Sequence, residues 1–383
     1  MSASLLITID GLPVTAHAGD TVFTAAKRAG LTIPGLCTSE HLAPFGSCRL
    51  CVCEVDGQKG TPASCTTPVQ AGMVVHTQTE RLVQLRRNVT ELLLSEQPKD
   101  GTLSAALQEL ARSVGLDHVR YRQPAVRDKV RDSSNPFFTF DNAVCISCAR
   151  CVRACDEMQG TFALTMAGRG FGSRPMAGAS GYGEAATGFA TSNCVSCGAC
   201  VKECPTGALA EKTVQQYGNP TETVRTICAY CGVGCMFDAG LRDGRVVTMV
   251  PADDGPSNHG HACMKGRFGW TYIYAEDRLK MPMLRTGSTW QAISWDVALD
   301  RLAYEFTRIK TEFGPDALAA ISSSRGTNEE NYLFGKFIRC VMGTNHIDNC
   351  ARVCHSATVT GMMETLGASA ATNSIQDLDQ AKL

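Results

Sequence analysis

The chain opens with alternating apolar and polar positions, in LLITI, as a half-buried strand does. Leu5 to Ile9 form a predicted strand, and the Asp10-Gly11 pair after it predicts a tight turn. A short helix is predicted from about Asp20 to Gly30. These elements indicate a small domain that begins with a strand, a turn and a helix.

A second pattern has the spacing of a helix. Apolar residues recur every three or four positions in ERLVQLRRNVTELLLSEQP, at Leu82, Leu85, Val89, Leu92 and Leu93. No cysteine motif occurs between residues 81 and about 130. We therefore expect residues 81–133 to form a packed helical connector.

The last third of the chain has an α/β pattern. A helix is predicted between an N-cap at Ser294 and a stop at Gly314, with apolar positions at Leu299, Leu302, Phe306, Ile309 and Phe313. A short strand is expected from Ala317 to Ile321, followed by a helix over Asn328–Met342. The next loop carries Cys354, which we expect outside a strand end, where α/β folds bind ligands.

Composition and charge exclude several classes of protein. The chain has 383 residues, a formal charge of −1, 44% hydrophobic and 19% charged residues, which suits a soluble protein of two or three domains. This balance predicts neither nucleic acid nor an anionic membrane as partner. No run of about 18 apolar residues predicts a membrane-spanning helix. The N-terminus lacks a signal sequence, so we expect a cytoplasmic protein.

The 20 cysteines are the unusual feature, because dense thiols in a reducing compartment point to metal. The first set has the spacing C-x10-C-x2-C-x13-C, at Cys37, Cys48, Cys51 and Cys65. After the strand, turn and helix, it suits a β-grasp ferredoxin domain over residues 1–80 with one [2Fe–2S] cluster. Cys53 is surplus and is expected to be a buried thiol.

Two further sets repeat the spacing C-x2-C-x2-C-x3-C within residues 134–218. In two-cluster ferredoxins the fourth cysteine of each run binds the other cluster. We therefore predict two [4Fe–4S] sites, one at Cys145, Cys148, Cys151 and Cys204, the other at Cys194, Cys197, Cys200 and Cys155. A pair of zinc sites is the alternative, since four thiolates also hold Zn²⁺. The glycine-rich insert from Asp156 to Asn193 resembles the hairpin excursion of such domains.

The fourth set has the spacing C-x2-C-x3-C-x27-C, at Cys228, Cys231, Cys235 and Cys263. This asymmetric pattern in residues 222–280 resembles the [4Fe–4S] domain that opens the bis-pterin molybdenum or tungsten oxidoreductases. Lys265 stands two residues past the last cysteine. The resemblance implies that Lys265 lies between the cluster and a pterin, on the electron path.

The first set resembles the N-terminal domain of the complex I large subunit and its relatives. In those relatives the connector leads to a cluster site of one histidine and three cysteines. Here the stretch SEQPKDGTLSAALQEL has neither residue, so one cluster fewer is expected.

Four cysteines remain: Cys53, Cys340, Cys350 and Cys354. Cys340 shares a helical face with apolar neighbours and is expected in the core. Cys350 and Cys354 offer only two ligands, so no fifth cluster is expected.

The segment GTNHIDNCARVCHSATVTG closely resembles the active site of molybdenum- or tungsten-dependent formate dehydrogenases. The resemblance implies that Cys354 ligates the metal of a bis-molybdopterin guanine dinucleotide cofactor. It implies that His355 relays a proton or orients the ligand, while formate is oxidised to CO₂. Two alternatives remain: a nitrate-type reductase, and an electron-transfer subunit whose pterin-type fold is metal-free, as in complex I.

The resemblance implies an α/β multidomain fold: a β-grasp ferredoxin domain, a two-cluster domain and the start of the bis-pterin fold in residues 281–383. The cluster array resembles soluble, NAD-linked enzymes. Electrons would pass from the metal through the Cys228-set cluster, the two ferredoxin clusters and the [2Fe–2S] cluster. The expected acceptor is a flavin-containing, NAD-reducing subunit with its own iron–sulfur clusters. The chain is expected to be the N-terminal portion of a larger catalytic subunit.

Overall fold

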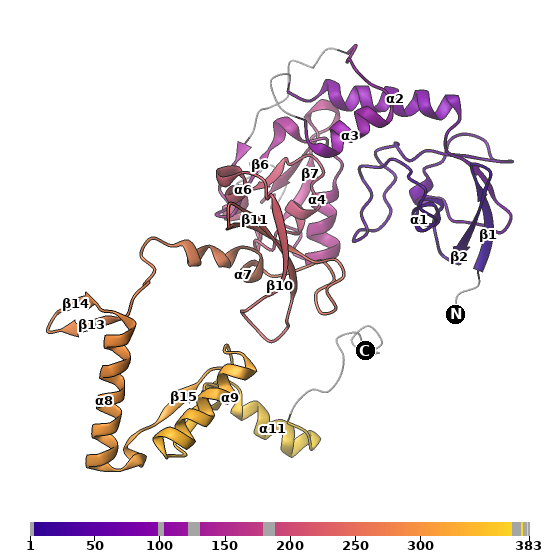
Figure 1. Cartoon of the computed structure of the whole chain (residues 1–383). Coiled ribbons are helices and arrows are strands. Elements are labelled where there is room, and N and C mark those ends of the chain that lie inside the picture. The colour runs from indigo at the N-terminus through magenta and orange to yellow at the C-terminus, as the bar shows by residue number, and fades with distance from the viewer. Residues whose placement is uncertain are drawn as a thin grey trace. The chain divides into compact units, whose positions relative to one another are not determined.

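The structure is a computed structural model that describes residues 4–98, 103–121, 131–178, 188–369, 377 and 381. It divides into two compact units, described separately here (Figure 1). The first unit holds the chain up to Ile227 together with Cys235–Gly269, and the second holds Cys228–Gly234 and the chain from Trp270 onward. Within the described ranges, no helix is long and apolar enough to cross a membrane.

The first unit begins with a four-stranded sheet in the order β2-β1-β4-β3. Its strands are β1 (Ser4–Ile9), β2 (Leu12–His17), β3 (Glu54–Val55) and β4 (Val74–His76). Asp10 and Gly11 make the β1–β2 turn with positive φ angles, and β1 pairs parallel to β4. Helix α1 (Val22–Arg28) packs on this sheet, capped by the Thr21 side chain. The predicted strand, turn and helix are confirmed.

Two helices form the described part of the connector, α2 (Glu80–Ser95) and α3 (Ala105–Ser113). Leu107 and Leu110 of α3 pack with Leu36 and Leu50 of the first cysteine loop. The predicted helix over residues 82–93 exists, but Leu92 is 50% exposed. The buried face of α2 is largely polar instead, because Arg86, Thr90 and Glu91 find hydrogen-bond or packing partners inside. Residues 99–102 and 122–130 lie outside the described residues.

The next part of the first unit carries the second and third cysteine sets. A three-stranded sheet runs in the order β5 (Arg131–Asp132), β6 (Phe138–Asp141) and β9 (Leu209–Glu211). Two short helices, α4 (Arg150–Arg153) and α5 (Ala199–Lys202), contact each other between the cysteine sets. The expected hairpin is confirmed for β7 (Leu164–Ala167) and β8 (Arg174–Ala177), while residues 179–187 of the insert are not described.

A second antiparallel sheet completes the first unit. It consists of β10 (Glu222–Ile227), β11 (Met236–Arg242) and β12 (Arg245–Pro251). Helix α6 (Lys212–Tyr217) leads into it, and α7 (Met264–Phe268) contacts β12.

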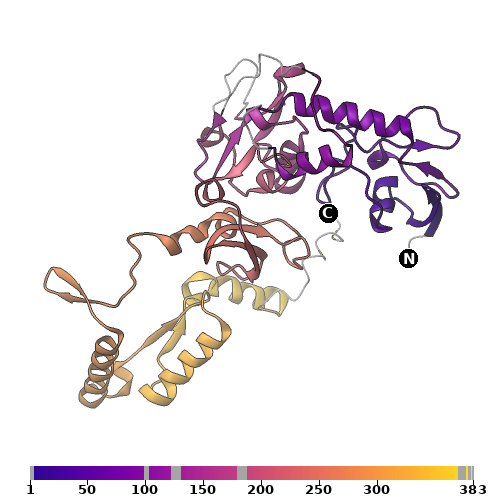
Figure 2. The same cartoon turned by 45° about the horizontal axis from the view of Figure 1, so that its top comes forward.

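The second unit contains a hairpin and a parallel β-α-β arrangement. The hairpin is β13 (Met283–Thr286) and β14 (Thr289–Ala292), and α8 (Trp295–Phe313) follows with Ser294 as N-cap and Gly314 at its end, as predicted. β15 (Ala320–Ser322) starts later than predicted and pairs parallel to β16 (Ile347–Asn349). Helix α9 (Asn328–Phe337), continued by a π-helical turn Ile338–Met342, contacts β15 (Figures 1 and 2).

The core of the second unit differs from the one that periodicity predicts. The buried residues there include Leu318, Ile338 and Met342, with Phe306 and Ile309 packed against them. Cys340 is exposed, so the prediction that it lies in the core was wrong. Leu333 and Val341 on the same helix are also exposed, because no described segment covers that face.

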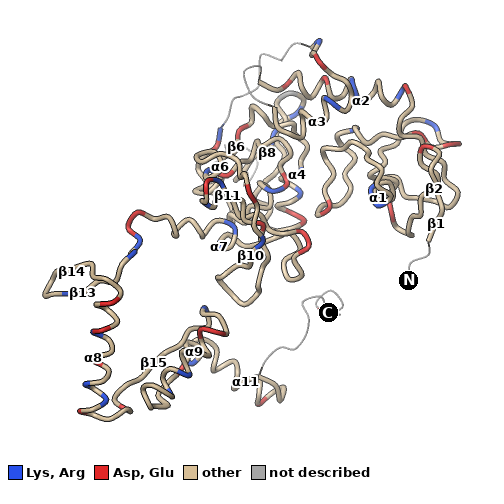
Figure 3. Tube along the Cα trace, in the orientation of Figure 1, with Lys and Arg blue, Asp and Glu red and all other residues tan. Residues whose placement is uncertain are grey.

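Positive and negative side chains are interspersed along the described chain (Figure 3). This distribution agrees with the near-zero formal charge of −1.

Candidate metal centres

The first set of thiols converges in the loops that follow α1. Cys37, Cys51 and Cys65 are buried and Cys48 is half-buried. The thiols of Cys48 and Cys65 hydrogen-bond to Cys37 and hold its pKa well below the ordinary thiol value. The Cys65 thiol likewise lowers the pKa of Cys51 to about 6. The structure therefore brings all four thiols into one group.

Backbone groups support this first set. The N–H of Leu36 donates to Cys48 Sγ and the N–H of Cys48 donates to Cys37 Sγ, each at 3.5 Å. Such donors stabilise a thiolate, which is the form that binds iron. Cys53 is fully buried in the β-sheet core, as predicted, and burial raises its pKa to about 11.

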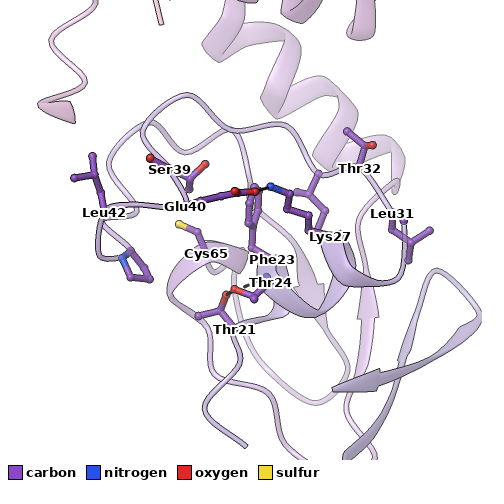
Figure 4. Close-up of a pocket in the computed structure, with 14 residues that line it drawn as sticks. Thr21, Phe23, Thr24, Lys27, Leu31, Thr32, Ser39, Glu40, Leu42 and Cys65 are labelled. Carbon is purple, nitrogen blue, oxygen red and sulfur yellow. Dashed lines mark hydrogen bonds and ion pairs between the residues drawn. The ribbon is translucent and has the colours of Figure 1, made fainter. Parts of the chain in front are cut away.

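A cavity of about 740 Å³ adjoins the first set (Figure 4). Cys65 lines it together with Phe23, Leu42 and the ion pair between Lys27 and Glu40. The first set therefore borders an open space on one side.

The second and third sets have the same local backbone. Ser147 and Ala149 stand at φ 52° and 59°, and the matching Ser196 and Gly198 stand at φ 54° and 79°. A positive φ after the first and second cysteine turns the chain so that the third cysteine enters a short helix, α4 or α5. The duplication seen in the sequence is thus repeated in the fold.

The fourth cysteine of each run lies with the other run. Cys145, Cys148, Cys151 and Cys204 line a single cavity. In the same way, the charge of Cys155 acts on the thiols of Cys194, Cys197 and Cys200. This arrangement matches the geometry that the two-cluster pairing requires.

Donors and burial fit both groups to an iron-containing centre. Four N–H groups donate to sulfurs at 3.2–3.4 Å: Ser147 to Cys145, Ala163 to Cys155, Ser196 to Cys194 and Leu209 to Cys204. Burial raises the pKa of Cys151 and of Cys200 well above the ordinary value. Buried thiols ionise only if a positive centre offsets the charge, and bound iron would supply one.

The fourth set is divided between the two units. Cys228 and Cys231 fall in the second unit and Cys235 and Cys263 in the first, so we describe them separately. The first three occupy the loop between β10 and β11, and Cys263 precedes α7. In the first unit, Asn258 Oδ1 accepts from the N–H of Met236 at 2.8 Å and Asn258 Nδ2 donates to His261 O at 3.0 Å. Asn258 thereby fixes the loop before Cys263 to the strand after Cys235.

The remaining candidates are exposed. Lys265 lies in α7. Cys354 ends α10 (Ala351–Cys354), two residues of chain after β16 gives way to that helix, and His355 separates α10 from α11 (Ser356–Leu366). This is the predicted position past the end of a parallel strand. In the described part of the chain, neither the Cys354 nor the His355 side chain has a hydrogen-bond partner.

Three buried arginines near these sites escaped the sequence reasoning. Arg86 and Arg153 donate to backbone carbonyls of the first cysteine loop, and Arg267 pairs with Glu211. Long basic side chains are usually exposed, and no local pattern distinguishes these three. Within the described ranges, no group of three or more His, Cys, Asp or Glu side chains is close enough to hold a single metal ion.

Family models match the chain in four consecutive parts. Residues 2–80 match the 2Fe-2S iron-sulfur cluster binding domain and residues 144–208 the 4Fe-4S dicluster domain. Residues 221–275 match the molybdopterin oxidoreductase Fe4S4 domain and residues 278–383 the molybdopterin oxidoreductase domain. The chain joins iron–sulfur domains to a molybdopterin oxidoreductase domain. The α/β multidomain fold class expected from the sequence is confirmed.

Relatives of this iron–sulfur molybdopterin chain carry several names. The NADPH-Fe(3+) oxidoreductase subunit alpha of Geobacter sulfurreducens is 35% identical over 98% of this chain and 44% of the relative. A Staphylococcus aureus protein named provisionally as a formate dehydrogenase is 28% identical over the whole of this chain and 43% of the relative. A solved NAD⁺-reducing [NiFe]-hydrogenase chain is 35% identical, with TM-score 0.46, over 55% of this chain and 88% of that one. The chain thus spans less than half the length of these curated relatives.

Proposed function

We propose that the chain belongs to the catalytic subunit of a molybdenum- or tungsten-dependent formate dehydrogenase that passes electrons toward NAD⁺. One observation carries the proposal. The exposed Cys354 thiol lies just past a parallel strand and is followed by His355, in a chain with several grouped thiol sets. The Staphylococcus aureus relative's name agrees with this activity.

Each thiol set has a role in this proposal. The first set would hold one [2Fe–2S] cluster, the two ferredoxin-type groups one [4Fe–4S] cluster each, and the fourth set a third [4Fe–4S] cluster. The chain would divide into residues 1–80, 81–133, 134–218, 222–280 and 281–383. The buried thiols and N–H donors described above suit iron–sulfur clusters in the first three sites.

Cys354, His355 and Lys265 would serve the catalytic cofactor. A soft thiolate at Cys354 suits a high-valent metal held by the dithiolenes of bis-molybdopterin guanine dinucleotide. When bound, that cofactor supplies a two-electron acceptor, so that formate yields CO₂, two electrons and one proton. The His355 imidazole, with an ordinary pKa of about 6.5, would take that proton or orient the Cys354 sulfur. The exposed ammonium of Lys265 would lie between the fourth cluster and a pterin.

The proposal is tested by metal analysis and by a matched pair of cysteine variants in the full-length protein. One [2Fe–2S] and three [4Fe–4S] clusters predict roughly 14 iron per chain, with about one molybdenum or tungsten. Cys354→Ala is expected to abolish formate oxidation and keep the iron. Cys340→Ala removes an equally exposed thiol and is expected to leave activity unchanged. Formate turnover retained in Cys354→Ala would refute the proposal.

A second candidate function rests on the Geobacter relative. Its identity of 35% over 98% of the chain favours an NADPH-linked iron(III) reductase within the same architecture. NADPH-dependent Fe(III) reduction without formate oxidation would favour it. Iron near the expected value without molybdenum or tungsten would favour the metal-free electron-transfer subunit, and nitrate-dependent oxidation of a reduced dye would favour a nitrate-type reductase.

We also propose a flavin-containing, NAD-reducing partner subunit with its own iron–sulfur clusters. The Geobacter relative is named as subunit alpha, which supports assembly with other chains. Copurification of a flavoprotein with formate-dependent NAD⁺ reduction is the expected result. A complex that contains no flavin and does not reduce NAD⁺ would contradict it.

A further inference from the structure

The first cysteine loop is held by a guanidinium from the two-cluster part of the first unit. Arg153 belongs to α4, between Cys151 and Cys155. Its Nη2 donates to the carbonyl oxygen of Cys37 at 2.6 Å, and its Nη1 donates to that of Ala43 at 2.5 Å. The side chain is 9% exposed, lies over the Phe45 ring, and its Nε has no hydrogen-bond partner among the described residues.

A second guanidinium holds the same loop from the connector. Arg86 of α2 is 3% exposed and donates through Nε to Leu50 O at 2.9 Å and through Nη2 to Val52 O at 2.8 Å. These two carbonyls flank Cys51. Its Nη1 donates to Thr77 O at 2.5 Å. The backbones beside two of the four thiols are thus each held by a buried cation.

Neither cation is neutralised by a paired carboxylate. In the described part of the chain, Arg86 and Arg153 make no ion pair. Two acidic groups lie nearby: Asp10 acts electrostatically on Arg86 and is hydrogen-bonded to Thr77, and Glu157 accepts from the N–H of Ala43 at 2.6 Å. Positive charge in a buried setting is weakly screened, so it acts strongly on nearby negative charge.

We propose that Arg86 and Arg153 are positioning residues of the first thiol set, and that they raise the reduction potential of the [2Fe–2S] cluster which this set would hold. Reduction adds one negative charge to a cluster of four thiolates, and fixed positive charge favours the reduced form. Arg153 also fastens that cluster loop to the helix between Cys151 and Cys155, which fixes the spacing between successive electron carriers. The inference rests on the cluster assignment of the proposed function.

The test is an EPR-monitored redox titration of the [2Fe–2S] signal in the full-length protein, with dithionite as reductant. Arg153→Met and Arg86→Met are each expected to make the cluster about tenfold harder to reduce, a shift of about 59 mV for one electron. Arg87→Met is the matched control. It removes one positive charge from α2 at a residue that makes no hydrogen bond to the cysteine loop in the described structure, and its potential is expected to stay within twofold of wild type.

The lysine variants keep the test decisive if a methionine variant loses its cluster. Arg153→Lys and Arg86→Lys retain the charge, so each is expected to keep its iron and to shift the reduced-to-oxidised ratio less than threefold. Methionine variants that keep the signal at the wild-type potential would overturn the proposal, as would lysine variants shifted as far as the methionine ones. A wild-type protein without a [2Fe–2S] signal would overturn the cluster assignment as well. Formate turnover enters neither measurement.

Discussion

At the scale of single residues, the same side chain has opposite properties in the two units. Cys53 is fully buried among the strands of the first sheet, whereas Cys340 is exposed on the π-helical turn that continues α9. Burial disfavours the thiolate and raises the pKa of Cys53 to about 11. Reactivity toward electrophiles follows the accessible thiolate.

Alkylation should therefore separate these two thiols. Iodoacetamide at pH 8 is expected to label Cys340 and to leave Cys53 unmodified in the folded protein, as read by peptide mass spectrometry. An unfolded thiol ionises near pH 8.5 and folded Cys53 near 11, so the stability that Cys53 contributes is lost as pH rises between these values. Equal labelling of both thiols at pH 8 would contradict the assignment, and guanidinium-unfolded protein is the control for full reactivity.

The duplicated cysteine runs place alanine and glycine at matching positions, which allows a paired test. Gly198→Ala is expected to destabilise by about 2–4 kcal/mol, because φ is 79° and the new Cβ would lie 2.9 Å from Phe268 Cζ. Ala149→Gly removes a left-handed alanine and is expected to be neutral or to stabilise by up to about 1 kcal/mol. Urea unfolding of the iron-loaded protein measures both, and equal effects would contradict the argument.

At the scale of elements, a buried ion pair fastens helix α7 to strand β9. Arg267 Nη2 lies 2.5 Å from Glu211 Oε1, both residues are buried, and Arg267 Nη1 also donates to the carbonyl of Met249 in β12. Burial lowers the pKa of Arg267 and raises that of Glu211 in spite of their mutual attraction. The pair therefore connects the two-cluster part to the segment after Cys263 at a high desolvation cost.

A double-mutant cycle should expose this dependence. Arg267→Met leaves Glu211 unpaired and is expected to cost about 3–5 kcal/mol. Adding Glu211→Gln removes the stranded charge and keeps the Thr248 hydroxyl partner, so the double variant should be more stable than the sum of the single changes implies. Thermal unfolding of the four proteins is the measurement. Strictly additive losses would mean that the two side chains are not coupled.

At the scale of the whole molecule, the chain between the two units is the exposed part of the path. Residues 275–282, between the turn Gly269–Tyr274 and β13, contain no regular element, and Leu279 is 75% exposed. Exposed, irregular segments are the preferred sites of proteolysis. The two units can therefore be separated at this segment.

Limited trypsin digestion should cut after Arg278 or Lys280 and leave the first three thiol sets on the N-terminal fragment. That fragment is expected to retain roughly 10 iron, from one [2Fe–2S] and two [4Fe–4S] centres, because its buried thiol groups are complete. Arg278→Gln with Lys280→Gln is the control that should remove the cut. Protection of both sites under conditions that cut elsewhere would contradict the described exposure.

Part of this molecule follows from local sequence. The β1–β2 turn, helix α8 with its cap at Ser294, and the repeated turns at Ser147 and Ser196 all follow from spacing and residue type, because each depends on neighbours within a few positions. The grouping of thiols also follows, since the run C-x2-C-x2-C-x3-C fixes a local backbone that can meet its duplicate.

The tertiary structure alone decided which polar groups are buried and which apolar faces are covered. Arg153 reaches the carbonyl of Cys37 across 116 positions of sequence, and nothing in its helical turn predicts that contact. Cys340 has the apolar neighbours of a core residue and is nevertheless exposed, because burial requires a second segment to cover the face. Local spacing determines where a side chain can point, whereas burial and charge environment depend on which distant segment packs against it.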